Sequence, residues 1–179
     1  MALIVEDGTG RSDAESYVGL SDADAYATAR GLTFPIDAGA PATAAEQALR
    51  RATAWIDGAY RTRFPGFRKE FRVQTLEWPR RGAYDIHGYP IGESELPREL
   101  KAATIEAAVR QLASPGALTP DVTPGKLKQS VTVDSISVTY ALGTGGVQEQ
   151  RLMMTVVDQI MSALLCGSPS LMFGSTERA

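Results

Sequence analysis

The chain has 179 residues, of which 44% are apolar, so it is long enough for one compact core with appendages. Cys166 is its only cysteine, which excludes an intrachain disulfide and a zinc site built from several thiolates of one chain. No apolar stretch reaches the roughly 20 residues of a membrane span, and residues 1–7 do not resemble a signal peptide. We therefore expect a soluble intracellular protein with no membrane partner.

The net charge of −3 conceals an uneven distribution of charge along the chain. Residues 1–60 carry four arginines against nine carboxylates, whereas residues 61–81 carry seven bases against Glu70 and Glu77. The centre of the chain is therefore basic and its flanks are acidic.

The first elements are a short strand and a helix. Residues 3–5 predict a strand that ends in the turn residues 7–10, because aspartate and glycine suit turn positions. Ser21 as N-cap and Gly31 as the stop residue predict a helix over residues 22–30.

A second helix begins at a capping box formed by Thr43 and Glu46. Its apolar stripe recurs at helical spacing and comprises Ala45, Leu49, Ala52, Ile56 and Ala59. Its polar face comprises Glu46, Gln47, Arg50, Arg51 and Asp57. This pattern predicts a helix on the outside of a bundle or against another subunit.

Residues 62–96 show no sustained period and are interrupted by proline and glycine, which predicts a long loop. Loops of this length are usually functional or disordered, and the six aromatic residues of this one argue for order. We expect an ordered loop between the second and third helices.

A third helix is predicted over residues 97–114, with a wide apolar arc that suits a central position. A β-hairpin is expected over residues 128–141, because the apolar residues change phase across a turn at 134–135. A last amphipathic helix is predicted over residues 148–166, followed by a tail over residues 168–179.

The chain is accordingly expected to be mainly α: a small bundle of about four helices with a long ordered loop and a β-hairpin. We expect a single domain over residues 1–167 with its helical core at 20–115, and a docking tail beyond it. The tail contains Leu171, Met172 and Phe173, which cannot bury themselves in so short a segment. A frayed terminus is the alternative for this tail.

Few residues suggest catalysis or cofactor binding. Any serine or cysteine triad would have to use His87, the only histidine, and no nucleophile motif accompanies it. The Gly-rich residues 143–146 lack the Lys-Ser/Thr sequel of a phosphate-binding loop, and the paired carboxylates lack an EF-hand pattern. The sequence predicts no enzyme, no cofactor and no metal site.

The strongest candidate site is the segment 61–81, where seven bases alternate with Phe64, Phe67, Phe71 and Trp78. Bases and aromatics together can bind single-stranded nucleic acid by neutralising phosphates and stacking on bases. Arginine and aromatic residues are equally typical of protein interfaces, and the sequence pI of 5.2 favours that alternative.

Several segments, in order, resemble the head-tail connector (adaptor) proteins of tailed bacteriophages, a family also described as DnaT-like single-stranded-DNA-binding domains. They are residues 5–10, 14–18, 23–26, 48–53, 56–57, Leu76-Glu77-Trp78-Pro79-Arg80-Arg81-Gly82, 88–91, Pro97 and 100–103. The resemblance covers roughly residues 3–142, and its most specific motif is the Trp-Pro-Arg core.

The resemblance implies a structural virion protein of the neck, made in the host cytoplasm. Such a protein forms a ring, of twelve copies, between the portal and the stopper or tail-completion protein, and DNA passes through its channel. It implies Leu171, Met172 and Phe173 as the portal anchor. The candidates for subunit contact or loop anchoring are Arg63, Phe67, Trp78, Pro79, Arg80, Arg81 and Tyr89.

Overall fold

The computed structural model describes residues 2–34, 42–119, 130–133, 136–139 and 154–165. The chain divides into two units, which are described separately: Met1–Leu118 with Met154–Ala179, and Thr119–Met153. The described helices are α1 (Leu20–Ala29), α2 (Ala42–Tyr60), α3 (Arg98–Ala113) and α4 (Thr155–Met161). The strands are β1 (Phe67–Arg68), β2 (Arg80–Arg81), β3 (Ser130–Val133) and β4 (Ile136–Thr139). The predicted mainly α class with a hairpin is confirmed.

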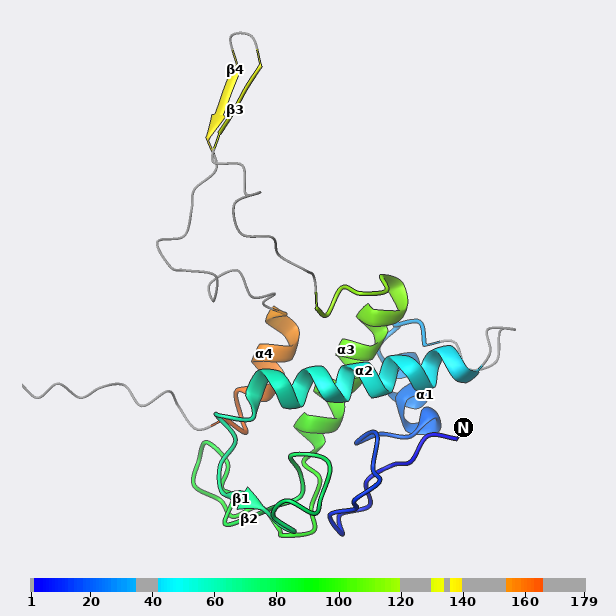
Figure 1. Ribbon diagram of the computed structural model, residues 1–179, viewed down its shortest axis with the longest axis vertical. Coiled ribbons are helices and arrows are strands. Elements are labelled where there is room, and N and C mark those ends of the chain that lie inside the picture. Colours follow the sequence, from blue (N-terminus) through cyan, green and yellow to red (C-terminus); the bar gives the residue numbers. More distant parts are fainter. Residues whose placement is uncertain (1, 35–41, 120–129, 134–135, 140–153, 166–179) are drawn as a thin grey trace, which may run out of the picture. The chain divides into compact units, whose positions relative to one another are not determined.

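Helix α3 is the centre of the first unit and packs against α1, α2 and α4 (Figure 1). Its wide apolar arc is buried, with Leu100, Ala103 and Ala107 fully shielded from solvent. Its small alanine side chains let neighbouring helices approach closely. The helix starts after Pro97, which occupies the N-cap position. The predicted central helix is therefore confirmed.

Helix α2 buries the stripe that its sequence predicts, with Ala45, Leu49, Ala52 and Ile56 fully shielded. Asp57 was expected on the polar face, and that expectation is wrong, because its side chain is 6% exposed. It is buried because it bonds a tyrosine 40 residues earlier in the chain.

Two predictions near the N-terminus need correction. Helix α1 begins at Leu20 after Gly19, which makes no side-chain cap, so Ser21 lies inside the helix and is not its N-cap. Gly31 follows the helix with a φ of +67°, as its stop role requires. Residues 3–5 form no strand; Val5 makes one isolated parallel bridge to Ser16.

The long loop between α2 and α3 is ordered, as predicted, and contains a small antiparallel sheet that the sequence pattern did not reveal. Phe67 pairs with Arg81 and Arg68 pairs with Arg80. Trp78 is fully buried, and its ring packs edge to face on the Phe64 ring with 5.9 Å between the ring centroids.

The second unit contains a β-hairpin of β3 and β4. Val131 pairs with Val138 and Val133 with Ile136, the register that a two-residue turn at 134–135 predicts. The remainder of the predicted hairpin lies outside the described residues.

The last helix, α4, covers only part of the predicted range 148–166. Within the described residues it begins after Met154 and ends at Met161, where turns carry the chain to Leu165. Val157 and Met161 face the core, and residues 148–153 and 166 lie outside the described part of the chain.

Candidate functional site

A buried polar cluster joins the N-terminal segment, α2 and the long loop. The Tyr17 hydroxyl donates to Asp57 Oδ1 at 2.6 Å, and the Glu77 backbone N–H donates to Asp57 Oδ2 at 3.1 Å. The Trp78 backbone N–H donates to the Tyr17 hydroxyl oxygen at 3.2 Å. These bonds fix the start of the cis Trp78–Pro79 segment against the helical core.

Burial dominates the electrostatics of this cluster. Desolvation raises the pKa of Asp57 to about 7, although the Tyr17 and Glu77 hydrogen bonds oppose the rise. Desolvation, together with the nearby Asp57 carboxylate, also raises the pKa of Tyr17 well above its ordinary value. Tyr17 is therefore a neutral donor at physiological pH, which suits a structural bond.

Arg80 holds the loop together from inside. Its guanidinium donates to the carbonyl oxygens of Pro65 at 2.6 Å and Gly66 at 2.7 Å, and it forms an ion pair with Glu77 at 3.1 Å. The side chain is 8% exposed, and burial lowers its pKa from the ordinary arginine value. Arg80 is thus a structural cross-link and is not available to an external ligand.

Most other bases of the segment 61–81 are also engaged within the chain. Lys69 Nζ donates to Gly8 O at 3.0 Å and to Ser94 Oγ at 2.7 Å, and Arg68 donates to Gln74 O. Arg81 pairs with Glu70 at 3.4 Å and with Glu93 at 3.9 Å. Arg61 donates to Asp57 O at 3.3 Å.

Arg63 and Arg72 differ from these five bases. Both side chains are exposed, and neither makes a hydrogen bond or an ion pair with any residue that the structure describes. They are the bases of the loop that remain free to meet an external group.

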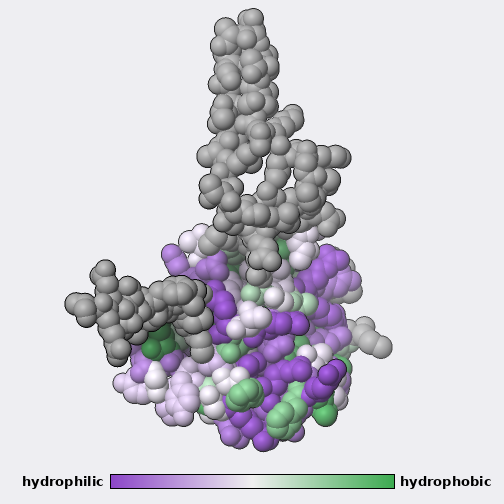
Figure 2. All heavy atoms as spheres, turned by 60° about the vertical axis from the view of Figure 1, so that its left-hand side comes forward, coloured by the Kyte–Doolittle hydropathy of each residue, from purple (hydrophilic) through white to green (hydrophobic). Residues whose placement is uncertain are grey.

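The apolar residues of the same loop fall into a buried group and an exposed group. Phe64 and Trp78 are buried, whereas Phe67, Phe71 and Val73 are 77%, 68% and 70% exposed. We call these three exposed residues the loop knob. Phe67 belongs to β1, and Phe71 and Val73 lie on the turns that follow, in which Phe71 N–H donates to Arg68 O and Val73 N–H to Glu70 O. On the face shown in Figure 2, hydrophobic residues likewise lie among hydrophilic ones.

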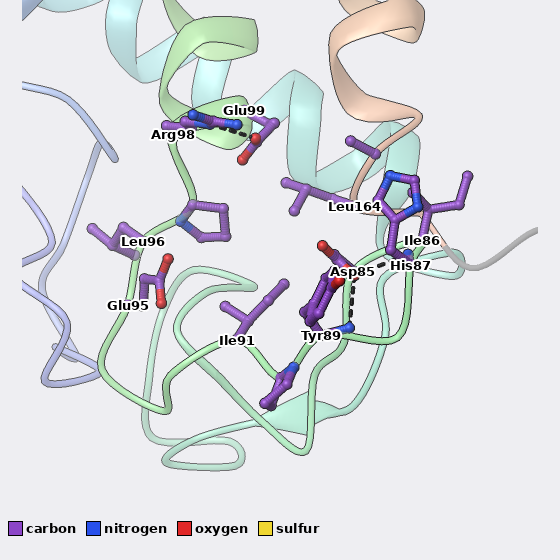
Figure 3. A pocket seen from close by; sticks show the side chains of 13 residues that line it. Asp85, Ile86, His87, Tyr89, Ile91, Glu95, Leu96, Arg98, Glu99 and Leu164 are labelled. Atoms are coloured by element: carbon purple, nitrogen blue, oxygen red, sulfur yellow. Dashed lines mark hydrogen bonds and ion pairs between the residues drawn. The ribbon is translucent and has the colours of Figure 1, made fainter.

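A pocket of about 560 Å³ lies beside the loop, between the turn 85–89 and the segment 95–99 (Figure 3). Ile86 and Tyr89 are exposed on one side, and Leu96, which Pro97 follows in the chain, lies on the other. Leu164 comes from the turns that follow α4. We call this pocket the loop groove. Its remaining lining residues are Asp85, His87, Pro90, Ile91, Glu95, Arg98, Glu99 and Ala163.

The described lining of the groove holds no serine or cysteine triad. Asp85 Oδ1 accepts from the backbone N–H groups of His87 and Tyr89, so this carboxylate caps a turn and does not orient the imidazole. No serine, threonine, cysteine or lysine is among the described residues that line it. The three carboxylates Asp85, Glu95 and Glu99 outnumber Arg98, so the described lining is acidic and more polar than apolar.

The predicted site residues therefore separate into two groups. Trp78, Pro79 and Arg80 are buried and anchor the loop, whereas Arg63, Phe67, Arg81 and Tyr89 are at the surface. The predicted portal anchor Leu171, Met172 and Phe173 lies outside the described residues. Sequence reasoning missed Val73 and Ile86, which no motif or periodicity singles out, and it placed Leu164 only on the apolar face of the last helix.

The described residues show neither a metal-binding cluster nor a membrane-spanning helix. They contain no group of three or more histidine, cysteine, aspartate or glutamate side chains placed to hold a metal ion. In the same residues, no helix is both long and apolar enough to cross a membrane.

The sequence matches a protein-family model described as "Putative DnaT-like ssDNA binding protein" over residues 1–179. No curated protein and no solved structure matches the chain. The chain therefore belongs to this DnaT-like family.

Proposed function

We propose that this member of the DnaT-like family is a head-tail adaptor of a tailed bacteriophage, a structural virion protein that forms a ring beneath the portal. The resemblance described above motivates the proposal. Its partners would be further copies of itself, the portal, and the stopper or tail-completion protein, with DNA passing through the ring. It would catalyse no reaction.

The observation that carries the proposal is the way the loop 62–96 uses its side chains. Five of the seven bases in residues 61–81 are bonded to other groups of the chain, while Phe67, Phe71 and Val73 are exposed to solvent. A surface for nucleic acid needs free cations. A surface with exposed apolar residues and a few free arginines suits contact with another protein.

The acidic net charge supports the same function. DNA must move along the channel of an adaptor, and a basic lumen would bind each phosphate that it met. A chain with a net charge of −3 and two free arginines in its basic segment suits passage of DNA better than retention.

The test is to mix the purified protein with its cognate portal ring and to image the mixture by cryo-electron microscopy. We expect a symmetric layer of this protein beneath the portal. The tail around Leu171, Met172 and Phe173 should be ordered against the portal, and a chain truncated after residue 167 should not join the layer. Portal rings that stay bare at saturating protein would contradict the proposal.

Binding of single-stranded DNA is the second candidate function, favoured by the family description and by two exposed aromatics near free arginines. Phe67 and Phe71 could stack on bases while Arg63 and Arg72 neutralise phosphates. A titration with labelled single strands at low and moderate salt decides between the two. Tight binding that weakens steeply with salt, and that Phe67→Ser with Arg72→Ser abolishes, would support DNA binding.

A further inference from the structure

Two surfaces of the first unit carry charges of opposite sign. The loop knob presents Phe67, Phe71 and Val73 to solvent, with Arg63 and Arg72 as nearby free cations. The loop groove presents Ile86 and Tyr89 beside a largely polar lining that includes Asp85 and Glu95. The two surfaces share no residue, and each remains exposed in a single copy of the chain.

The groove has the dimensions of a binding site. Its volume of about 560 Å³ lies within the range of roughly 300–1,000 Å³ that binding pockets occupy. Ile86 and Tyr89 are 62% and 68% exposed, although the turn that carries them is held by Asp85 and by the bond from Ile86 N–H to Ala163 O. A fixed turn that exposes large apolar side chains is preorganised for a partner.

The charges around the two surfaces are opposite in sign. Arg98 is the only arginine or lysine among the described residues that line the groove, and it pairs with Glu99 at 2.8 Å. Asp85 and Glu95 are then left without a cationic partner among the described residues, although both accept backbone hydrogen bonds. Arg63 and Arg72 supply the complementary charge beside the knob.

We propose that the loop knob of one copy occupies the loop groove of the next copy, so that this protein assembles through a heterologous, head-to-tail contact. The inference rests on the proposed function and identifies the surfaces through which neighbouring copies in the ring would touch. A contact between two different surfaces repeats from copy to copy, and it produces a ring when the rotation between copies closes. Phenylalanine and arginine are among the residues enriched at protein interfaces.

Two double variants test this contact in the full-length chain. The knob variant is Phe67→Ser with Phe71→Asn; asparagine suits position 71, whose φ is +52°. The groove variant is Ile86→Ser with Tyr89→Ser. Val156→Ser, at an exposed apolar residue of α4, is the matched control.

Sedimentation velocity over a series of concentrations gives the readout. We expect the parent chain and the control to self-associate, and each double variant to associate roughly 30-fold or more weakly, as expected for loss of hot-spot aromatics. An equimolar mixture of the two variants should form a dimer and nothing larger, because each variant keeps one intact surface. That dimer also shows that both variants are folded.

Other outcomes overturn the inference. A parent chain that stays monomeric up to its solubility limit shows that the contact does not form. A groove variant that assembles like the parent, with only the knob variant impaired, shows a knob-to-knob contact instead. If both variants still join a portal-bound layer, the adaptor function stands and the contact falls. If the protein assembles head to tail but does not bind the portal, the knob-to-groove contact stands and the adaptor function is wrong.

Discussion

At the scale of single residues, burial of Asp57 has a consequence for stability. Its pKa is raised to about 7 in the folded chain from an ordinary value of 3.8, so the folded state holds a proton that the unfolded state has lost. Between those two pH values the unfolded chain binds fewer protons. The free energy of unfolding therefore falls as pH rises from about 4 to about 7, by at most about 4 kcal/mol.

We predict that Asp57→Asn flattens this part of the pH profile, because asparagine does not titrate. Tyr17→Phe should act in the opposite direction, since the Tyr17 hydroxyl lowers the pKa of Asp57 and its loss extends the fall to higher pH. Urea unfolding at several pH values measures both effects. The double variant Tyr17→Phe with Asp57→Asn should lose this pH dependence of the free energy of unfolding. If it keeps the slope of Tyr17→Phe alone, Asp57 is not the group that titrates.

Arg80 gives a second prediction at this scale. Arg80→Lys should destabilise the fold by about 2 kcal/mol or more, because an ammonium group cannot reach Pro65 O, Gly66 O and Glu77 together. Arg72→Lys is the matched control at an exposed site and should change stability by less than about 0.5 kcal/mol. Urea unfolding midpoints compare them, and equal midpoints would show that the buried cross-link is dispensable.

At the scale of elements, substitutions at two glycines of the loop can distinguish the cost of backbone strain from the cost of steric overlap. Gly66 and Gly82 have φ values of +65° and +63°. A Cβ at Gly66 would overlap the Arg81 carbonyl oxygen, whereas a Cβ at Gly82 meets nothing among the described residues.

Gly82→Ala should therefore cost only the left-handed conformation, about 1–2 kcal/mol. Gly66→Ala should cost clearly more, because the pairing of β1 with β2 must also move. Chemical unfolding of the two variants measures the difference. Equal losses would show that this sheet yields without cost.

The helices and the hairpin could be predicted from sequence because their signals are local. The α2 stripe and the hairpin phase change at 134–135 depend on residues a few positions apart. The start of α1 was misplaced because Gly19 takes the N-cap position without any side-chain bond. The strands β1 and β2 have two residues each, which is too short for a period to appear.

The candidate site was only partly predictable, because its geometry depends on distant contacts. Arginine and aromatic enrichment marked the segment 61–81, but composition cannot show that Arg80 is buried while Phe67 is exposed. The loop groove joins residues 85–99 to Ala163 and Leu164, far apart in sequence. Neither segment has a sequence motif that predicts its contact with the other.

At the scale of the whole molecule, the two units should be separable. Each is compact by its own contacts, and α3 and α4 pack together within the first unit although residues 119–153 lie between them. We predict that replacing residues 120–153 with a flexible linker of about 15 glycines and serines leaves the helical unit folded. Its helical circular dichroism and its urea midpoint should match those of the parent chain. A collapsed midpoint would show that the second unit supports the first.

The late position of α4 in the chain also affects how the protein emerges from the ribosome. The side of α3 that α4 covers is completed well before α4 itself is made. At about 5–20 residues per second, the nascent chain carries that uncovered apolar surface for at least a few seconds. Translation that pauses in this interval would leave a half-built core open to chaperones and to aggregation with neighbouring nascent chains.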